Sequence, residues 1–158
     1  MLTSTWPHDL TLDARHRLQL PAPVREGLPR VGEAWEAVIG VLPKGGDGTA
    51  DDCLWLMSNA QYDAFVARLG TLAKDSAQGR QVKTLTLRNF SHVGVDAQGR
   101  ITIPEKLLQR ASIDRTVTLI GMKDRVEIWA TEVVERMEAV RSVDVRADLE
   151  RLLAGEGG

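Results

Sequence analysis

Apolar and polar residues alternate over several short segments of the chain, and two of these segments end at a proline. Residues 17–20 read Arg-Leu-Gln-Leu, residues 100–103 read Arg-Ile-Thr-Ile, and proline follows each directly. Alternation of this kind predicts a half-buried β-strand. Proline stops such a strand and suits the first turn of a helix. The pattern therefore predicts return strands in these two segments, followed by short helices at 22–28 and 105–111.

Each return strand is preceded by another strand and a tight turn, and each short helix is followed by a hairpin and a longer helix. The longer helix of the first half begins at a predicted capping box of Ser58 and Gln61, flanked by Met57 and Tyr62 as a hydrophobic staple. The other predicted elements are strands at 9–12 and 91–95, hairpins of 35–41 with 53–57 and of 116–120 with 125–130, a connecting helix at 77–88 and a C-terminal helix at 131–153.

A repeated motif accounts for this parallel between the two halves. Residues 13–21 read DARHRLQLP and residues 96–104 read DAQGRITIP. The offset of 83 matches Asp13 with Asp96, Ala14 with Ala97, Arg17 with Arg100 and Pro21 with Pro104. Self-similarity of this kind indicates a duplicated structural unit. A loop rich in Gly and Asp at 43–52 lengthens the first half, and we expect it to be mobile.

Composition is typical of a globular protein and excludes several other classes. The 158 residues are 43% hydrophobic and 27% charged. No apolar run approaches the ~20 residues of a membrane helix, and no basic segment precedes an apolar one at the N-terminus, as a secretory signal requires. We therefore expect a cytoplasmic protein. Its single cysteine, Cys53, lies on an apolar strand and is expected to be a buried structural thiol.

The sequence contains no recognisable catalytic or metal-binding set. Its three histidines stand at separate strand or turn positions, and no Cys/His cluster has the spacing of a zinc site. Neither a Ser/His/Asp set nor a Gly-rich phosphate loop before a helix is apparent. We therefore expect no enzymatic activity, no cofactor, no metal and no small-molecule substrate.

Net charge restricts where a nucleic acid could bind. The formal charge is −2, so a nucleic-acid site must be a local basic feature. The first 79 residues carry 7 Lys and Arg against 10 Asp and Glu, and the remaining residues carry 13 against 12. Arg80, Lys83 and Arg88 on the connecting helix either flank a DNA surface or form a solvated helix face, which is the more common arrangement.

The two turns with the pattern Asp-x-x-x-Arg provide local basic features. A hairpin turn is narrow enough to enter a major groove ~12 Å wide, and an arginine fork forms two hydrogen bonds with a phosphate or a guanine edge. The aspartate can accept backbone N–H bonds or orient the arginine. The alternative interpretation is a structural Asp–Arg pair. The candidate DNA-binding residues are Asp13, Arg15, His16, Arg17, Asp96, Gly99 and Arg100.

The paired turns, each followed by alternating residues and proline, resemble the AbrB-like swapped-hairpin DNA-binding domain. Two copies in one chain of this length resemble the MraZ family of bacterial transcriptional regulators. The stretches CLWLMSNAQY and VDAQGRITIPEKLLQRASIDRTVTLIGMKDRVEIW carry the resemblance, which covers roughly residues 8–138. It implies an α+β fold of two duplicated AbrB-like swapped-hairpin β-barrel halves with flanking helices, in which each half could complete the barrel of the other.

The resemblance also implies a function. Expected partners are double-stranded DNA, bound at short direct repeats in the promoter of a cell-division and cell-wall gene cluster, and further copies of the chain in a ring-shaped homo-oligomer associated with the nucleoid. Two alternatives remain: an AbrB-like antitoxin that binds a toxin, and a ring-forming structural protein with degenerate DNA sites. His16 stands where the family usually has glycine, and a Cβ resists positive φ. We therefore expect the first turn to differ in shape or to be strained.

The predicted division of the chain follows from the repeat. It assigns 4–57 to the first half, 58–72 to its closing helix, 77–88 to the connecting helix, 89–130 to the second half, 131–153 to the C-terminal helix and 154–158 to a disordered tail.

Overall fold

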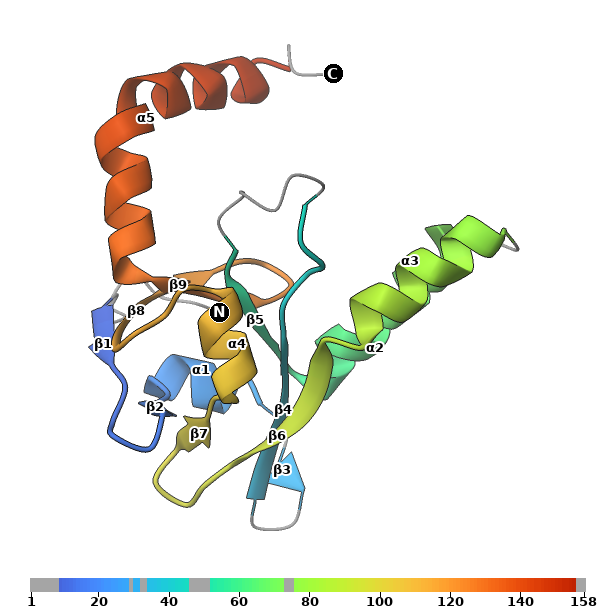
Figure 1. The fold of residues 1–158 in the computed structure, drawn as a ribbon, viewed down its shortest axis with the longest axis vertical. Helices are drawn as coiled ribbons and strands as arrows, with labels where there is room; N and C mark the ends of the chain where they lie inside the picture. Colours follow the sequence, from blue (N-terminus) through green and yellow to red (C-terminus); the bar gives the residue numbers. More distant parts are fainter. Residues whose placement is uncertain (1–8, 29, 32–33, 46–51, 73–75, 156–158) are drawn as a thin grey trace.

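A computed structural model describes residues 9–28, 30–31, 34–45, 52–72 and 76–155 (Figure 1). It combines antiparallel strands with helices, which confirms the α+β class. The elements are β1 (Asp9–Thr11), β2 (Arg17–Gln19), α1 (Ala22–Glu26), β3 (Arg30–Val31), β4 (Ala34–Gly40), β5 (Leu54–Met57), α2 (Asn59–Leu72), α3 (Ala77–Leu87), β6 (Phe90–Val95), β7 (Arg100–Thr102), α4 (Glu105–Arg110), β8 (Thr116–Gly121), β9 (Val126–Ala130) and α5 (Thr131–Leu153).

Within the described residues, the strands form a seven-stranded sheet and a two-stranded ribbon. The sheet has the order β1-β8-β9-β5-β4-β3, with β6 also paired to β4, and the ribbon pairs β2 with β7. Both predicted hairpins are present, because β4 pairs with β5 and β8 pairs with β9. The two-residue strand β3 was not predicted, since it is too short to show an alternating pattern.

Strands on either side of each repeated turn pair with the other half of the chain. β1 pairs with β8 in the second half, and β6 pairs with β4 in the first half. β2 and β7, one from each half, pair with each other. The two arms of each turn therefore diverge toward different partners, and neither half forms its sheet without strands from the other.

One hydrophobic core joins the two halves. The inward-facing residues of the alternating segments, Leu18, Leu20, Ile101 and Ile103, are at most 1% exposed and belong to the main cluster of buried side chains. Complete burial of such a side chain contributes about 1.5–3 kcal/mol. The inner face of the β2–β7 ribbon is buried in this core, so its other face points away from the core.

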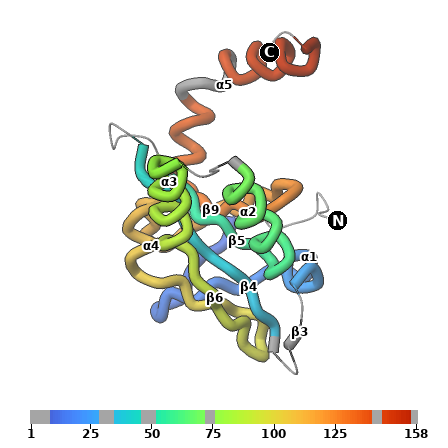
Figure 2. The backbone as a smooth tube through the Cα atoms, turned by 90° about the vertical axis from the view of Figure 1, so that its right-hand side faces the viewer, coloured from blue at the N-terminus to red at the C-terminus, as the bar shows by residue number. Residues whose placement is uncertain are grey.

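Two of the helices that flank the sheet, α3 and α5, project away from it (Figure 1). The capping box of α2 is confirmed: the Gln61 N–H donates to Ser58 Oγ at 3.2 Å, and the Ser58 N–H donates to Gln61 Oε1 at 2.9 Å. The predicted connecting helix is α3, which packs beside α2 (Figure 1). The C-terminal helix α5 leaves the sheet and extends away from it (Figure 2). Among the described helices, none has both the length and the apolar character needed to cross a membrane.

Parts of three predicted segments lie outside the described residues. They are residues 4–8, 29 and 32–33 of the first half, most of the 43–52 loop, and the end of the tail at 156–158. Of the predicted disordered tail, Ala154 and Gly155 are described, and they form a turn that continues from α5. In this turn the Ala154 N–H donates to the Glu150 carbonyl at 3.1 Å.

Candidate nucleic-acid interface

The first turn, residues 13–17, is organised around the carboxylate of Asp13. Its Oδ1 accepts the backbone N–H groups of Arg15 at 2.8 Å and Arg17 at 2.9 Å, and its Oδ2 accepts Arg17 Nε at 2.6 Å. The Asp13 N–H donates to the Arg17 carbonyl, and the His16 N–H donates to the Asp13 carbonyl. One carboxylate thus fixes both the backbone of the turn and the direction of its arginine.

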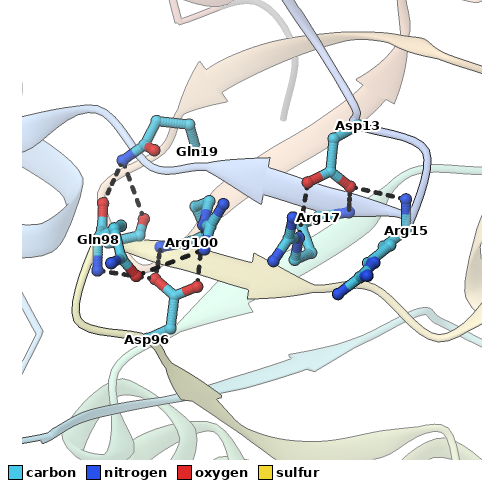
Figure 3. A network of polar contacts seen from close by, with 8 residues as sticks. Asp13, Arg15, Arg17, Gln19, Asp96, Gln98 and Arg100 are labelled. Carbon is cyan, nitrogen blue, oxygen red and sulfur yellow. Dashed lines mark hydrogen bonds and ion pairs between the residues drawn. The ribbon is translucent and has the colours of Figure 1, made fainter.

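The second turn, residues 96–100, repeats these bonds at the offset of 83. Asp96 Oδ1 accepts the N–H groups of Gln98 and Arg100, both at 2.9 Å, and Asp96 Oδ2 accepts Arg100 Nε at 2.9 Å. The two backbone bonds within the turn are also conserved between the halves. The sequence repeat is therefore a repeat of hydrogen-bonded geometry (Figure 3).

These bonds keep the two aspartates ionised. The backbone N–H of Arg17 is the largest cause that lowers the pKa of Asp13 from 3.8 to about 2, and the N–H of Arg100 likewise lowers the pKa of Asp96. Each charged carboxylate holds an arginine by Nε. Among the described residues, the Nη groups of Arg17 have no hydrogen-bond partner, and Arg100 Nη2 makes one contact of 3.4 Å with Gln98. Each guanidinium therefore retains donors for an external acceptor.

The first turn has the same shape as the second despite its histidine. His16 has φ 61° and Gly99 has φ 81°, so both adopt the left-handed conformation. Of the two expected outcomes, a different shape or strain, the structure shows the second, because the bonds to Asp13 impose the same turn. A residue with a Cβ is uncommon at positive φ. Histidine in place of glycine at position 16 therefore strains the backbone of the first turn.

The β2–β7 ribbon places the two turns side by side. Leu18 pairs with Ile101, which is its own repeat equivalent, so the register is symmetric about this pair. The Leu20 N–H donates to the Gly99 carbonyl and the Ile103 N–H to the His16 carbonyl, both at 2.9 Å, which extends the same symmetry. Since side chains alternate along a strand and Leu18 and Ile101 are fully buried, the remaining ribbon side chains face outward. They are Arg17, Gln19, Arg100 and Thr102.

All seven predicted residues therefore lie on one ribbon and its two turns. The structure adds contacts that the sequence interpretation missed. Gln19 Nε2 donates to the carbonyl of Gln98 at 2.7 Å and lies 3.5 Å from the carbonyl of Gly99. Gln19 occupies an outward position of the alternating pattern, which is a signal that could have identified it. Arg25 of α1 lies over Gly99, and nothing in its local sequence indicates this.

Other candidate groups are not brought to the turns. Arg80 and Lys83 lie on α3 and Arg88 caps its C-terminal end, and this helix projects away from the ribbon (Figure 1). Cys53 is buried, and desolvation raises the pKa of its thiol to about 12, as expected of a structural thiol. No cluster of three or more His, Cys, Asp or Glu side chains suited to a metal occurs in the described part of the chain.

Comparisons with known proteins give consistent matches. A family model described as "MraZ protein, putative antitoxin-like" matches residues 87–154. The protein named "Transcriptional regulator MraZ" of Caldanaerobacter subterraneus subsp. tengcongensis is 36% identical over 145 residues, which cover 92% of this chain and 90% of that protein. Its namesake in Thermoanaerobacter sp. (strain X514) is 36% identical over 85% of both chains. That of Symbiobacterium thermophilum is 34% identical over 77% of this chain and 79% of its own length.

Proposed function

The chain belongs to the MraZ family of transcriptional regulators, and we propose that it binds double-stranded DNA sequence-specifically through the first and second turns. The observation that carries this proposal is the outward pair of arginines, each held by Nε on an ionised aspartate at equivalent positions of one ribbon. Relatives in this family are named as regulators and not as enzymes, which confirms the prediction that the chain is not an enzyme.

The two-stranded form of the β2–β7 ribbon supports binding in the major groove. A two-stranded β-ribbon fits this groove, and arginine donates two hydrogen bonds to O6 and N7 of guanine. Because each Nε is already bound to a carboxylate, the Nη groups of Arg17 and Arg100 are the donors directed at a base or phosphate. Arg15 and His16 add phosphate contacts at the first turn. Asp13 and Asp96 position the arginines, and Gly99 allows the tight second turn.

Several copies of the chain act together in this proposal. One ribbon is small beside the ~1,000–2,500 Å² that specific protein–DNA interfaces bury, so the expected assembly is a ring-shaped homo-oligomer that engages a series of direct repeats. Exposed apolar side chains support self-association. They lie on two helices that project from the sheet, at Val82 and Leu85 of α3 and at Val145, Leu149, Leu152 and Leu153 of α5. The proposed target is the promoter of a cell-division and cell-wall gene cluster in the nucleoid.

The decisive experiment removes the two arginines. Sequencing of DNA that co-purifies with the protein identifies the probe, and fluorescence anisotropy measures affinity for that duplex. Arg17→Ala and Arg100→Ala should each weaken binding by about 5- to 150-fold, which corresponds to ~1–3 kcal/mol for one bidentate contact. Arg80→Ala, on exposed α3 away from the ribbon, is the matched control. Unchanged affinity in both variants and in the double variant, with unchanged circular dichroism, would refute the assignment.

Probe spacing tests the direct-repeat arrangement. Successive copies on one face of DNA must meet repeats about one helical turn apart, ~10–10.5 bp. Insertion of about 5 bp between repeats should therefore reduce affinity far more than insertion of a full turn. Equal tolerance of both insertions contradicts the arrangement, and binding that is insensitive to salt favours the alternative of a protein partner, such as a toxin.

A further inference from the structure

An arginine from outside both turns covers the tip of the second turn. Arg25 belongs to α1 (Ala22–Glu26), which is in the first half of the chain. A Cβ built on Gly99 would lie 3.1 Å from Arg25 Cζ and closer still to its Cδ and Nη1. Gly99 is buried, although it stands at the tip of an outward turn. The guanidinium of Arg25 is thus seated directly on the second turn.

Backbone and side-chain bonds hold α1 in this position. The Leu20 N–H donates to the Gly99 carbonyl at 2.9 Å, two residues before α1 begins. Gln19 Nε2 donates to the Gln98 carbonyl at 2.7 Å. Two consecutive residues of the first half therefore bind the tip of the second turn, so the distance from this tip to α1 is fixed by short bonds rather than by a flexible loop.

Comparison of the halves shows that the second turn lacks an arginine that the first turn has. The first turn contains Arg15, whereas the repeat equivalent in the second turn is Gln98, which is neutral. The equivalent of Arg25 on α4 is Leu108, which is only 4% exposed and belongs to the core. The first turn thus has its second arginine within its own loop, and the second turn obtains one from α1.

We propose that Arg25 is a DNA-contacting residue of the second turn and binds a phosphate there, as Arg15 does at the first turn. The described residues offer Arg25 no carboxylate partner, so its charge is available to an anion. Each turn then presents two guanidinium groups around one ionised aspartate. This inference rests on the proposed DNA-binding function and extends the site beyond the two repeated motifs.

The test compares charge with packing at this position. Arg25→Lys keeps the charge, whereas Arg25→Gln keeps most of the stem that covers Gly99 but removes the charge. Each phosphate contact contributes about −0.9 to the slope of log K against log salt. On the duplex recovered from co-purified DNA, Arg25→Gln should make this slope less steep by about 0.9 per bound chain, and Arg25→Lys should retain it.

Two matched variants interpret the result. Arg15→Gln, which removes the corresponding charge from the first turn, should change the slope by the same amount, and Arg80→Gln on α3 should leave it unchanged. An unaltered slope in Arg25→Gln, together with weaker binding in Arg17→Ala and Arg100→Ala, overturns the role of Arg25 alone. If those two alanine variants also bind as the unaltered protein does, the proposed function itself fails. Thermal unfolding of each variant shows whether a loss of DNA binding results from destabilisation of the fold.

Discussion

Replacement of Gly99 by alanine tests the geometry of the second turn directly. Gly99 has φ 81°, and a Cβ at this position would contact the Arg25 side chain. The left-handed conformation costs a residue with a Cβ roughly 1–2 kcal/mol. Alanine also reduces the entropy of the unfolded chain, which offsets about 0.4–1 kcal/mol. Since Arg25 can move toward solvent, the expected net loss in the free energy of unfolding is about 1 kcal/mol.

His16 provides the matched position in the first turn. It already has a Cβ at φ 61°, so His16→Ala should leave the backbone contribution unchanged. His16→Gly removes the strain but makes the unfolded chain more flexible, so it should stabilise the protein by up to about 1 kcal/mol. Gly99→Ala and His16→Gly, at equivalent positions of the repeat, are therefore expected to change the free energy of unfolding with opposite signs.

Urea unfolding measures these differences, and one fixed protein concentration is used because the proposed self-association would make apparent stability depend on concentration. With an m-value of about 1–3 kcal/mol/M, a loss of about 1 kcal/mol lowers the midpoint by about 0.3–1 M. Gly99→Ala with an unchanged midpoint would refute the strain argument, as would a loss in His16→Ala equal to that in Gly99→Ala. Gly99→Ala should also reduce the salt dependence of DNA binding, because its methyl group displaces Arg25.

Three further outcomes are expected. Because the pKa of Asp13 is lowered to about 2, its contribution to stability is present above pH ~4, near the unfolded value, and is lost as pH falls toward 2. Asp13→Asn should therefore make urea stability less dependent on pH between about 5 and 2, and an unchanged dependence contradicts this. Ser58→Ala removes the cap of α2 and should lower the free energy of unfolding by about 1 kcal/mol in the same urea assay. An unchanged free energy of unfolding contradicts a stabilising role of the capping box. Cys53, buried and with its pKa raised to about 12, should react with a thiol reagent at pH 8 only across the unfolding transition, and rapid labelling of the folded protein argues against its burial.

Features that depend on neighbouring residues could be predicted from the sequence. The capping box needs only Ser58 and Gln61 at the correct spacing, and the structure confirms both of its bonds. The strand pairs joined by short turns were likewise predictable, because a hairpin brings its own arms together. The Asp–Arg pairing within each turn followed the same rule, since Asp13 and Arg17 are separated by only three residues.

Features that depend on tertiary placement could not be predicted from local patterns, although the family resemblance implied that each half could complete the other. β1 and β2 contain three residues each, too few for alternation to indicate which strand will pair with them, and both find partners in the other half. His16 at positive φ goes against its local preference, and the bonds to Asp13 outweigh this preference. Arg25 reaches the second turn only because β2 pairs with β7, so neither its helix nor its neighbours in sequence could reveal the contact.

The differences between the halves bear on how the chain would lie on DNA. A ribbon whose register maps onto itself through Leu18 and Ile101 presents two nearly equivalent turns. A site with full two-fold symmetry binds both orientations of a DNA segment equally well. Direct repeats and a head-to-tail ring instead require every copy to have one direction along the duplex. The second turn differs from the first in having glycine for His16, a neutral residue for Arg15 and the added guanidinium of Arg25. These side-chain differences make the two ends of the ribbon unequal, although its backbone pairing is symmetric. The ribbon can therefore distinguish the two directions along a DNA duplex.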